Sequence, residues 1–185
     1  MIRLDMSEYQ SIEAIDRLIG PASGQKGQEH LIWQIQQNPF SLVLLDELEK
    51  THPNILNLFL QVFDEGHLTS TSGQKVSFKN TIIIATSNAG AEFIRQYILS
   101  NKDLNLLSKE LLDFVQKQGI FKPEFLNRFD GVIAFKPLSP EHLKQIASLL
   151  LSNLAKSLLE QKEITFLYDE GLVQKIAKLG YDPVY

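Results

Sequence analysis

The sequence contains no cysteine among its 185 residues. That absence excludes disulfide bonds, thiolate chemistry and cysteine-ligated metal sites, and it suits the reducing cytoplasm, where we expect the protein to lie. No apolar run approaches the roughly 20 residues that a membrane-spanning helix needs. The first residues, Met1 to Asp5, lack the long apolar core of a secretory signal peptide. We therefore expect no association with a membrane.

Clusters of basic residues are also missing. The chain has 18 lysines and arginines against 22 acids, a formal net charge of −4, and no basic stripe, so nothing in its charge predicts nucleic-acid binding. The 44% hydrophobic and 22% charged content is ordinary for a globular domain. The histidines are too scattered to pair as metal ligands at helical spacing; they are His30, His52, His67 and His142.

Two acids follow directly on a short apolar strand, Leu42 to Leu45. A strand of a parallel sheet reads as a solid apolar block, and α/β sheets bind ligands at the carboxyl ends of their strands. Asp46 at that edge could hold Mg²⁺, largely through water, because Mg²⁺ dehydrates reluctantly. Glu47 could polarise an attacking water. By itself, the motif fits a nucleotide hydrolase and a strand that runs into an acidic turn about equally.

Alternating strand and helix patterns predict an α/β fold with a parallel sheet flanked by helices. Ser7 and Gln10 form a capping-box pattern that predicts a helix after the first strand, and Pro53 suits the first turn of another. A hairpin is expected to turn near Ser72 and Gly73. The expected strands are 2–5, 42–45, 81–86 and 131–135. The expected helices follow Ser7 and cover 30–37, 53–65, 91–99 and 106–117.

The carboxyl-terminal part has a different pattern. Lys136 and Pro137 suggest a linker, and Ser139 begins a long helix with a leucine-rich stripe that includes Leu150 and Leu154. A short strand at 164–167 and a helix at 171–179 complete this part. We therefore expect two subdomains: a large α/β subdomain, 1–136, and a small, mainly helical lid, 137–185.

Four motifs occur in an order and spacing that closely resemble the Clp-type AAA+ ATPases, the ring-forming protein unfoldases and disaggregases. They are the 42–47 strand with its acids, the segment 64–69, the 81–88 strand with its Ser-Asn ending, and the segment 121–130. The resemblance covers nearly the whole chain. It is strongest to the second, C-terminal ATPase module of these proteins.

The resemblance implies a role for each polar residue in these motifs. Asp46 would partner Mg²⁺, Glu47 would be the base that activates water, and Asn88 would be the sensor asparagine at the γ-phosphate of ATP. Arg128 would be the finger that reaches the nucleotide of the neighbouring subunit. From the residues alone, Asn88 also fits a helix cap, and Arg128 also fits a surface ion pair with an acid such as Asp130.

The segment Gly24, Gln25, Lys26 and Gly27 superficially suggests a phosphate-binding loop. It fails the G-x-x-x-x-G-K-[ST] pattern, which needs a glycine before the lysine and Ser or Thr after it. The resemblance instead places the segment at the pore loop that grips substrate. Gln25 stands where the family usually has an aromatic residue, so we expect a weaker or different grip on polypeptide.

No phosphate-binding loop occurs anywhere in the sequence. Because the family carries that loop upstream, we expect this chain to be a fragment of a longer protein, cut at both ends and inactive alone. The resemblance implies a parent that forms a hexameric ring, uses ATP and Mg²⁺, and threads polypeptides. The resemblance allows a Clp-type peptidase as a partner. Family members that bind such a peptidase carry a hydrophobic-Gly-hydrophobic docking loop, which residues 118–121 match only in part. The alternative is a non-catalytic assembly or adaptor remnant.

Overall fold

The computed structural model describes residues 1–20, 30–100, 102–136 and 138–180. The chain packs as two units, Met1–Ala134 and Phe135–Tyr185. The predicted pore loop, Gly24 to Gly27, lies outside the described residues. Within the described ranges, the helices are too short or too polar to cross a membrane.

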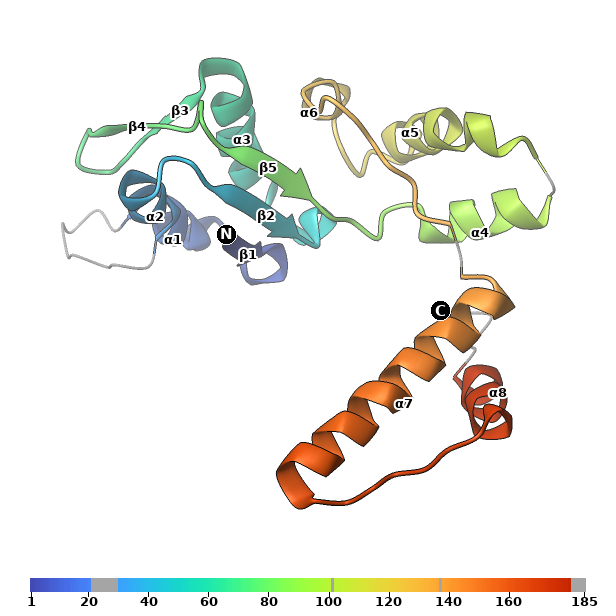
Figure 1. Cartoon of the computed structure of the whole chain (residues 1–185). Helices are drawn as coiled ribbons and strands as arrows, with labels where there is room; N and C mark the ends of the chain where they lie inside the picture. Colours follow the sequence, from blue (N-terminus) through green and yellow to red (C-terminus); the bar gives the residue numbers. More distant parts are fainter. Residues whose placement is uncertain (21–29, 101, 137, 181–185) are drawn as a thin grey trace. The chain divides into compact units, whose positions relative to one another are not determined.

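A three-stranded parallel sheet forms the centre of the first unit. Strand β2 (Leu42–Asp46) lies between β1 (Ile2–Asp5) and β5 (Ile82–Ala85), as Figure 1 shows. Leu45 is paired with Leu4 on one side and with Ala85 on the other, so the three strands end at one common edge. The predicted α/β fold with a parallel sheet is confirmed.

The core lies against one face of this sheet. Val43 and Leu45 are completely buried among apolar side chains of three helices, α1 (Ile15–Ile19), α2 (Leu31–Gln37) and α3 (Pro53–Glu65). The opposite face is more open. Two of its isoleucines are 67% and 46% exposed; they are Ile82 and Ile84. The apolar block at 42–45 thus predicted the strand correctly, but in the described chain burial is complete on only one face.

Helix α3 and the hairpin after it form as the sequence predicts. Pro53 occupies the first turn of α3, and Gly66 ends the helix in the left-handed region, with φ of 69°. Strands β3 (His67–Thr69) and β4 (Lys75–Ser77) then pair antiparallel. Gly66 is therefore the point at which the chain leaves the helix and enters the hairpin.

The remaining helices of the first unit are α4 (Ala91–Leu99), α5 (Leu107–Lys117) and the single turn α6 (Pro123–Leu126). Helices α4 and α5 pack together through Phe93 and Phe114, whose rings stack with centroids 4.7 Å apart. Short 3₁₀ turns precede α5 and follow β2; they are Leu104–Leu106 and Leu48–Lys50.

The predicted single helix after Ser7 is wrong. Met6–Glu8 and Ile12–Ala14 are separate 3₁₀ turns, and α-helix begins only at Ile15. The cause is Asp5, whose carboxylate accepts the N–H of Ser7 at 3.0 Å and its hydroxyl as well. Ser7 is thus inside a turn capped by Asp5, and it does not cap a helix.

Two predicted strands do not form. Residues 131–135 and 164–167 are irregular, because a strand needs a neighbour and no described strand pairs with either segment. Ile133, in the first of these segments, is 81% exposed. β-branched composition alone was therefore an insufficient signal in both places.

The second unit consists of α7 (Pro140–Lys162) and α8 (Glu170–Leu179) around a small core. Ser139 caps α7, as predicted, by accepting the N–H of His142 at 3.3 Å. The buried residues are Ala147, Leu151 and Val173. The predicted stripe is displaced around the helix, because Leu150 and Leu154 are 61% and 47% exposed.

Gly90, just before α4, provides a test of packing in the first unit. It has φ of 80°, and a Cβ there would lie 2.5 Å from Cδ1 of the buried Leu111. Gly73 has the same φ, but nothing lies within 4 Å of its Cβ position. Gly73→Ala should cost about 1 kcal/mol from left-handed strain alone. Gly90→Ala should cost about 1–3 kcal/mol more because it also overpacks the core.

Urea unfolding followed by fluorescence of Trp33 measures this difference, since Trp33 is the single tryptophan and lies on α2. Equal losses in the two variants would show that Leu111 moves aside freely.

Candidate functional site

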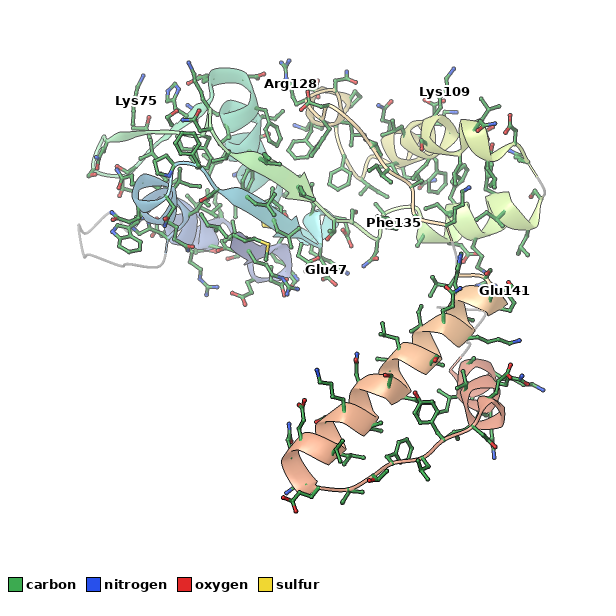
Figure 2. The ribbon with its side chains drawn as sticks, in the orientation of Figure 1. Glu47, Lys75, Lys109, Arg128, Phe135 and Glu141 are labelled. Carbon is green, nitrogen blue, oxygen red and sulfur yellow. The ribbon has the colours of Figure 1, made fainter. Side chains whose placement is uncertain are left out.

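The carboxyl edge of the parallel sheet gathers the polar residues that follow the strands. Asp46 is the last residue of β2 and is paired in register with Asp5 of β1. Thr86 follows β5 directly, and its N–H donates to the carbonyl of Leu45 at 2.9 Å. This hydrogen bond therefore joins the end of β5 to the end of β2, at the edge where Figure 2 labels Glu47.

The carboxylate of Asp46 has a partner for each oxygen. Oδ2 lies 2.6 Å from Nη2 of Arg3, and Oδ1 accepts the hydroxyl proton of Thr86. These hydrogen bonds, that of Thr86 first and that of Arg3 second, hold the pKa of Asp46 below its usual value. The carboxylate therefore keeps its charge down to a lower pH than an ordinary aspartate does.

Glu47 has an unusual backbone. Its φ of 56° and ψ of 48° are left-handed, a conformation that costs a non-glycine residue about 1–2 kcal/mol. Hydrogen bonds hold it there: the N–H of Glu47 donates to Oγ1 of Thr86 at 3.2 Å, and the N–H of Leu48 donates to the Thr86 carbonyl at 3.0 Å. Within the described chain, no hydrogen bond or ion pair occupies the Glu47 carboxylate. Glu163 at the end of α7 is also left-handed, with φ of 57°, so the strain at Glu47 indicates a functional site only together with its place at the carboxyl edge of the sheet.

Asn88 lies two residues beyond Thr86, and its side chain is exposed. The alternative role as a helix cap does not fit, because Gly90 occupies the N-cap of α4. Ser87 lies between Thr86 and Asn88. Its hydroxyl donates to Oε2 of Glu49 at 2.7 Å and accepts the N–H of Ala89 at 3.0 Å. The segment that carries Asn88 is thus tied to the turn after the acids, and none of the described residues hydrogen-bonds the amide of Asn88.

Arg128 lies elsewhere in the first unit. Figure 2 shows it near α6, well apart from Glu47. Its Nε is 2.7 Å from Oδ1 of Asp64 in the last turn of α3, and the two side chains are 48% and 44% exposed. The alternative of a surface ion pair is therefore seen in the structure, with Asp64 as the acid in place of Asp130, the example that the sequence suggested.

Aromatic residues fix the backbone around Arg128. Phe63 of α3 has ring centroids 5.7 Å from Phe125 and 5.5 Å from Phe129, and these two rings are 5.4 Å from each other. Such pairs add about 0.5–1.5 kcal/mol each beyond the burial of their surface. Phe125 and Phe129 flank Arg128 in sequence, so they hold it at the surface beside α3.

Two residues of the site escaped the sequence analysis, Arg3 and Thr86. Arg3 lies on β1 and Thr86 directly follows β5, the two strands next to β2. Each contacts Asp46 from far away in sequence, at separations of 43 and 40 residues. Part of the signal was present, because three parallel strands that end at one edge bring the polar residues near their ends together. The sequence did not reveal the register in which β1, β2 and β5 pair, and that register decides which polar residues contact each other.

Comparison with known families agrees with this geometry. A family model described as AAA domain (Cdc48 subfamily) matches residues 1–132, and one described as the C-terminal, D2-small domain of ClpB protein matches 138–185. The chain therefore belongs to the AAA family, Cdc48 subfamily. The predicted resemblance to the C-terminal ATPase module of Clp proteins is confirmed.

Individual Clp proteins align with the whole chain. The ATP-dependent Clp protease ATP-binding subunit ClpE of Bacillus subtilis (strain 168) is 44% identical over 189 residues, and chaperone protein ClpB of Clostridium perfringens is 42% identical over 190. The ATP-binding subunit ClpC of Staphylococcus saprophyticus is 40% identical over 195. Each alignment covers 100% of this chain but only 27%, 21% and 23% of the relative, respectively. The chain thus spans about a quarter of the length of these curated relatives.

Proposed function

We propose that this chain supplies the hydrolysis half of an ATP-hydrolysing module in a Clp-type protein-remodelling machine. The observation that carries the proposal is the acid pair at the end of the central strand, with Asp46 ionised and held on both oxygens and Glu47 strained with its carboxylate free. In this proposal 1–136 is the large subdomain of the module and 137–185 is its small lid.

The donor set at Asp46 fits Mg²⁺ bound through water. Arg3 and Thr86 already occupy one position on each carboxylate oxygen, so the remaining lone pairs suit water ligands of a hydrated ion. Mg²⁺ would neutralise charge on the phosphate oxygens of ATP. Glu47 would orient the attacking water and accept its proton, and Asn88 would hold the water or the γ-phosphate through its exposed amide.

Arg128 is proposed to act on the nucleotide of a neighbouring subunit. Its ion pair with Asp64 is half exposed, and such pairs are worth only about 0–1 kcal/mol. The guanidinium can therefore leave Asp64 for a phosphate at little cost, and its planar fork suits phosphate oxygens. This role requires a ring, for which we propose a hexamer.

The substrates and partners of the whole protein are proposed by analogy with its relatives. Two of the relatives are named as subunits of an ATP-dependent protease and one as a chaperone, so unfolding for a Clp-type peptidase and independent remodelling of polypeptides are both open. In either case polypeptide would be gripped by the pore loop with Gln25 at its centre. A cytoplasmic location remains a prediction.

A second candidate function is an assembly or adaptor piece that binds no nucleotide. The sequence feature that favours it is Gln25, which stands where the family usually has an aromatic residue. The presence of Asp46, Glu47, Asn88 and Arg128 together argues against it, because an adaptor needs no residues for hydrolysis.

The 185 residues alone should show no saturable micromolar binding of ATP. The backbone N–H groups and the lysine of a phosphate-binding loop carry most of the contact with a triphosphate, and the chain has no such loop. Titration with a fluorescent ATP analogue measures this. Micromolar binding would show that the nucleotide site has been misplaced.

The same chain, joined to the phosphate-binding half of a Clp relative, should give Mg²⁺-dependent ATP hydrolysis. Release of phosphate, with the relative's half alone as the control, decides between the two candidate functions. A folded fusion that binds ATP without hydrolysing it would favour the adaptor.

A further inference from the structure

Thr86 joins the end of β5 to the acid turn through four hydrogen bonds. Its backbone N–H donates to the carbonyl of Leu45 at 2.9 Å, and its carbonyl accepts the N–H of Leu48 at 3.0 Å. Its hydroxyl accepts the N–H of Glu47 at 3.2 Å and donates to the carboxylate of Asp46. One residue thus contacts each of the four successive residues 45–48.

The hydroxyl of Thr86 uses both of its hydrogen-bonding capacities on the acid pair. A hydroxyl has one proton to donate and lone pairs to accept with. The proton goes to Oδ1 of Asp46, and a lone pair takes the N–H of Glu47. Both bonds depend on the same oxygen, so its removal frees one oxygen of Asp46 and releases the backbone of Glu47 at once.

We propose that Thr86 is a positioning residue for hydrolysis: its hydroxyl sets the orientation of the Asp46 carboxylate and keeps Glu47 in the left-handed conformation. This inference rests on the proposed function of the acid pair. Because Thr86 also begins the segment that leads to Asn88, it fixes the spacing between the acids and the amide expected to hold the γ-phosphate.

The structure offers a matched control at the other end of β5. Thr81 lies just before β5, at the opposite end from Thr86, and its hydroxyl donates to the carbonyl of Phe78 at 2.7 Å. Thr81→Val removes a threonine hydroxyl at the other end of β5 without touching the acid pair. Thr86→Val removes the hydroxyl at nearly constant volume, and Thr86→Ser retains it.

The first measurement uses the 185-residue chain and needs no nucleotide. Hydrogen exchange of the Glu47 amide, followed by NMR, should accelerate about tenfold in Thr86→Val, because the acceptor of that N–H is gone. The amide should stay protected in Thr86→Ser and Thr81→Val. Unchanged protection of the Glu47 amide in Thr86→Val would overturn the inference, whether or not the protein hydrolyses ATP. If Val at this position disturbs the amides of β2, Thr86→Ala takes its place.

The second measurement uses the hydrolysing fusion with a Clp relative. Thr86→Val should lower kcat about 100-fold, as misplaced catalytic groups do, with KM for ATP within about twofold of the parent. Thr86→Ser should restore most of kcat, and Thr81→Val should match the parent. A loss confined to KM, or no loss, would overturn a positioning role. If the parent fusion hydrolyses no ATP, the proposed function is wrong, and the exchange measurement still decides whether the hydroxyl holds the acid turn.

Discussion

Glu47→Gln, in the hydrolysing fusion, is expected to leave ATP binding unchanged and to lower kcat by about 10²–10⁴-fold, the usual contribution of a positioned general base. Glutamine keeps the size of the side chain and an oxygen that accepts hydrogen bonds, but an amide cannot take a proton from water. The carboxylate of Glu47 has no partner among the described residues that the change would disrupt. The folded structure should therefore survive the substitution.

Glu49 gives the matched control for this prediction. It lies two residues after Glu47 in the same turn, and its carboxylate accepts the hydroxyl of Ser87 at 2.7 Å. Glu49→Gln removes a charge from the same turn but retains an acceptor for Ser87, so turnover should change by less than about threefold. Single-turnover hydrolysis and nucleotide affinity, measured on both variants, separate chemistry from binding. Near-normal turnover in Glu47→Gln would show that another group activates the water.

The central strand and its acids could be read from the sequence because both are local signals. Four apolar residues followed by Asp46 and Glu47 predict a strand, its end and an acidic edge without knowledge of any other element. The same holds for α3, which Pro53 and Gly66 delimit, and for the hairpin that begins after Gly66. Such elements depend on backbone preferences that each residue carries with it.

The parts that could not be predicted depend on partners far away in sequence. No residue near Asp46 in the sequence indicates that its carboxylate will hydrogen-bond Arg3 and Thr86, because these contacts depend on the register of three parallel strands. Arg128 likewise meets Asp64, an acid on another element, and not the nearby Asp130. The segment 131–135 fails as a strand for the same reason, since pairing is decided by a neighbour and not by composition.

Arg128→Ala should leave ATP binding by the assembled fusion nearly intact and lower turnover by about a thousandfold or more, the effect of an arginine that stabilises the transferring phosphoryl group. Asp64→Asn separates this role from a structural one. It breaks the ion pair with Arg128 but leaves the arginine in place, held by Phe125 and Phe129. If the ion pair alone matters, the two variants should be equally impaired. If Arg128 acts on phosphate, Asp64→Asn should keep turnover within about threefold of the parent.

Mixing of two inactive variants tests whether Arg128 acts on a neighbouring subunit. Subunits with Glu47→Gln keep Arg128, and subunits with Arg128→Ala keep Glu47. In a mixed ring some interfaces therefore join an intact Glu47 to an intact Arg128 of the next subunit. Partial recovery of ATP hydrolysis on mixing is expected, rising and then falling as the ratio of the variants changes. Mixed rings, demonstrated by differently tagged subunits, that recover no activity would contradict independent sites completed by the neighbour's Arg128. Rings formed by Glu47→Gln with the double variant Glu47→Gln, Arg128→Ala have no intact Glu47 and should stay inactive at every ratio.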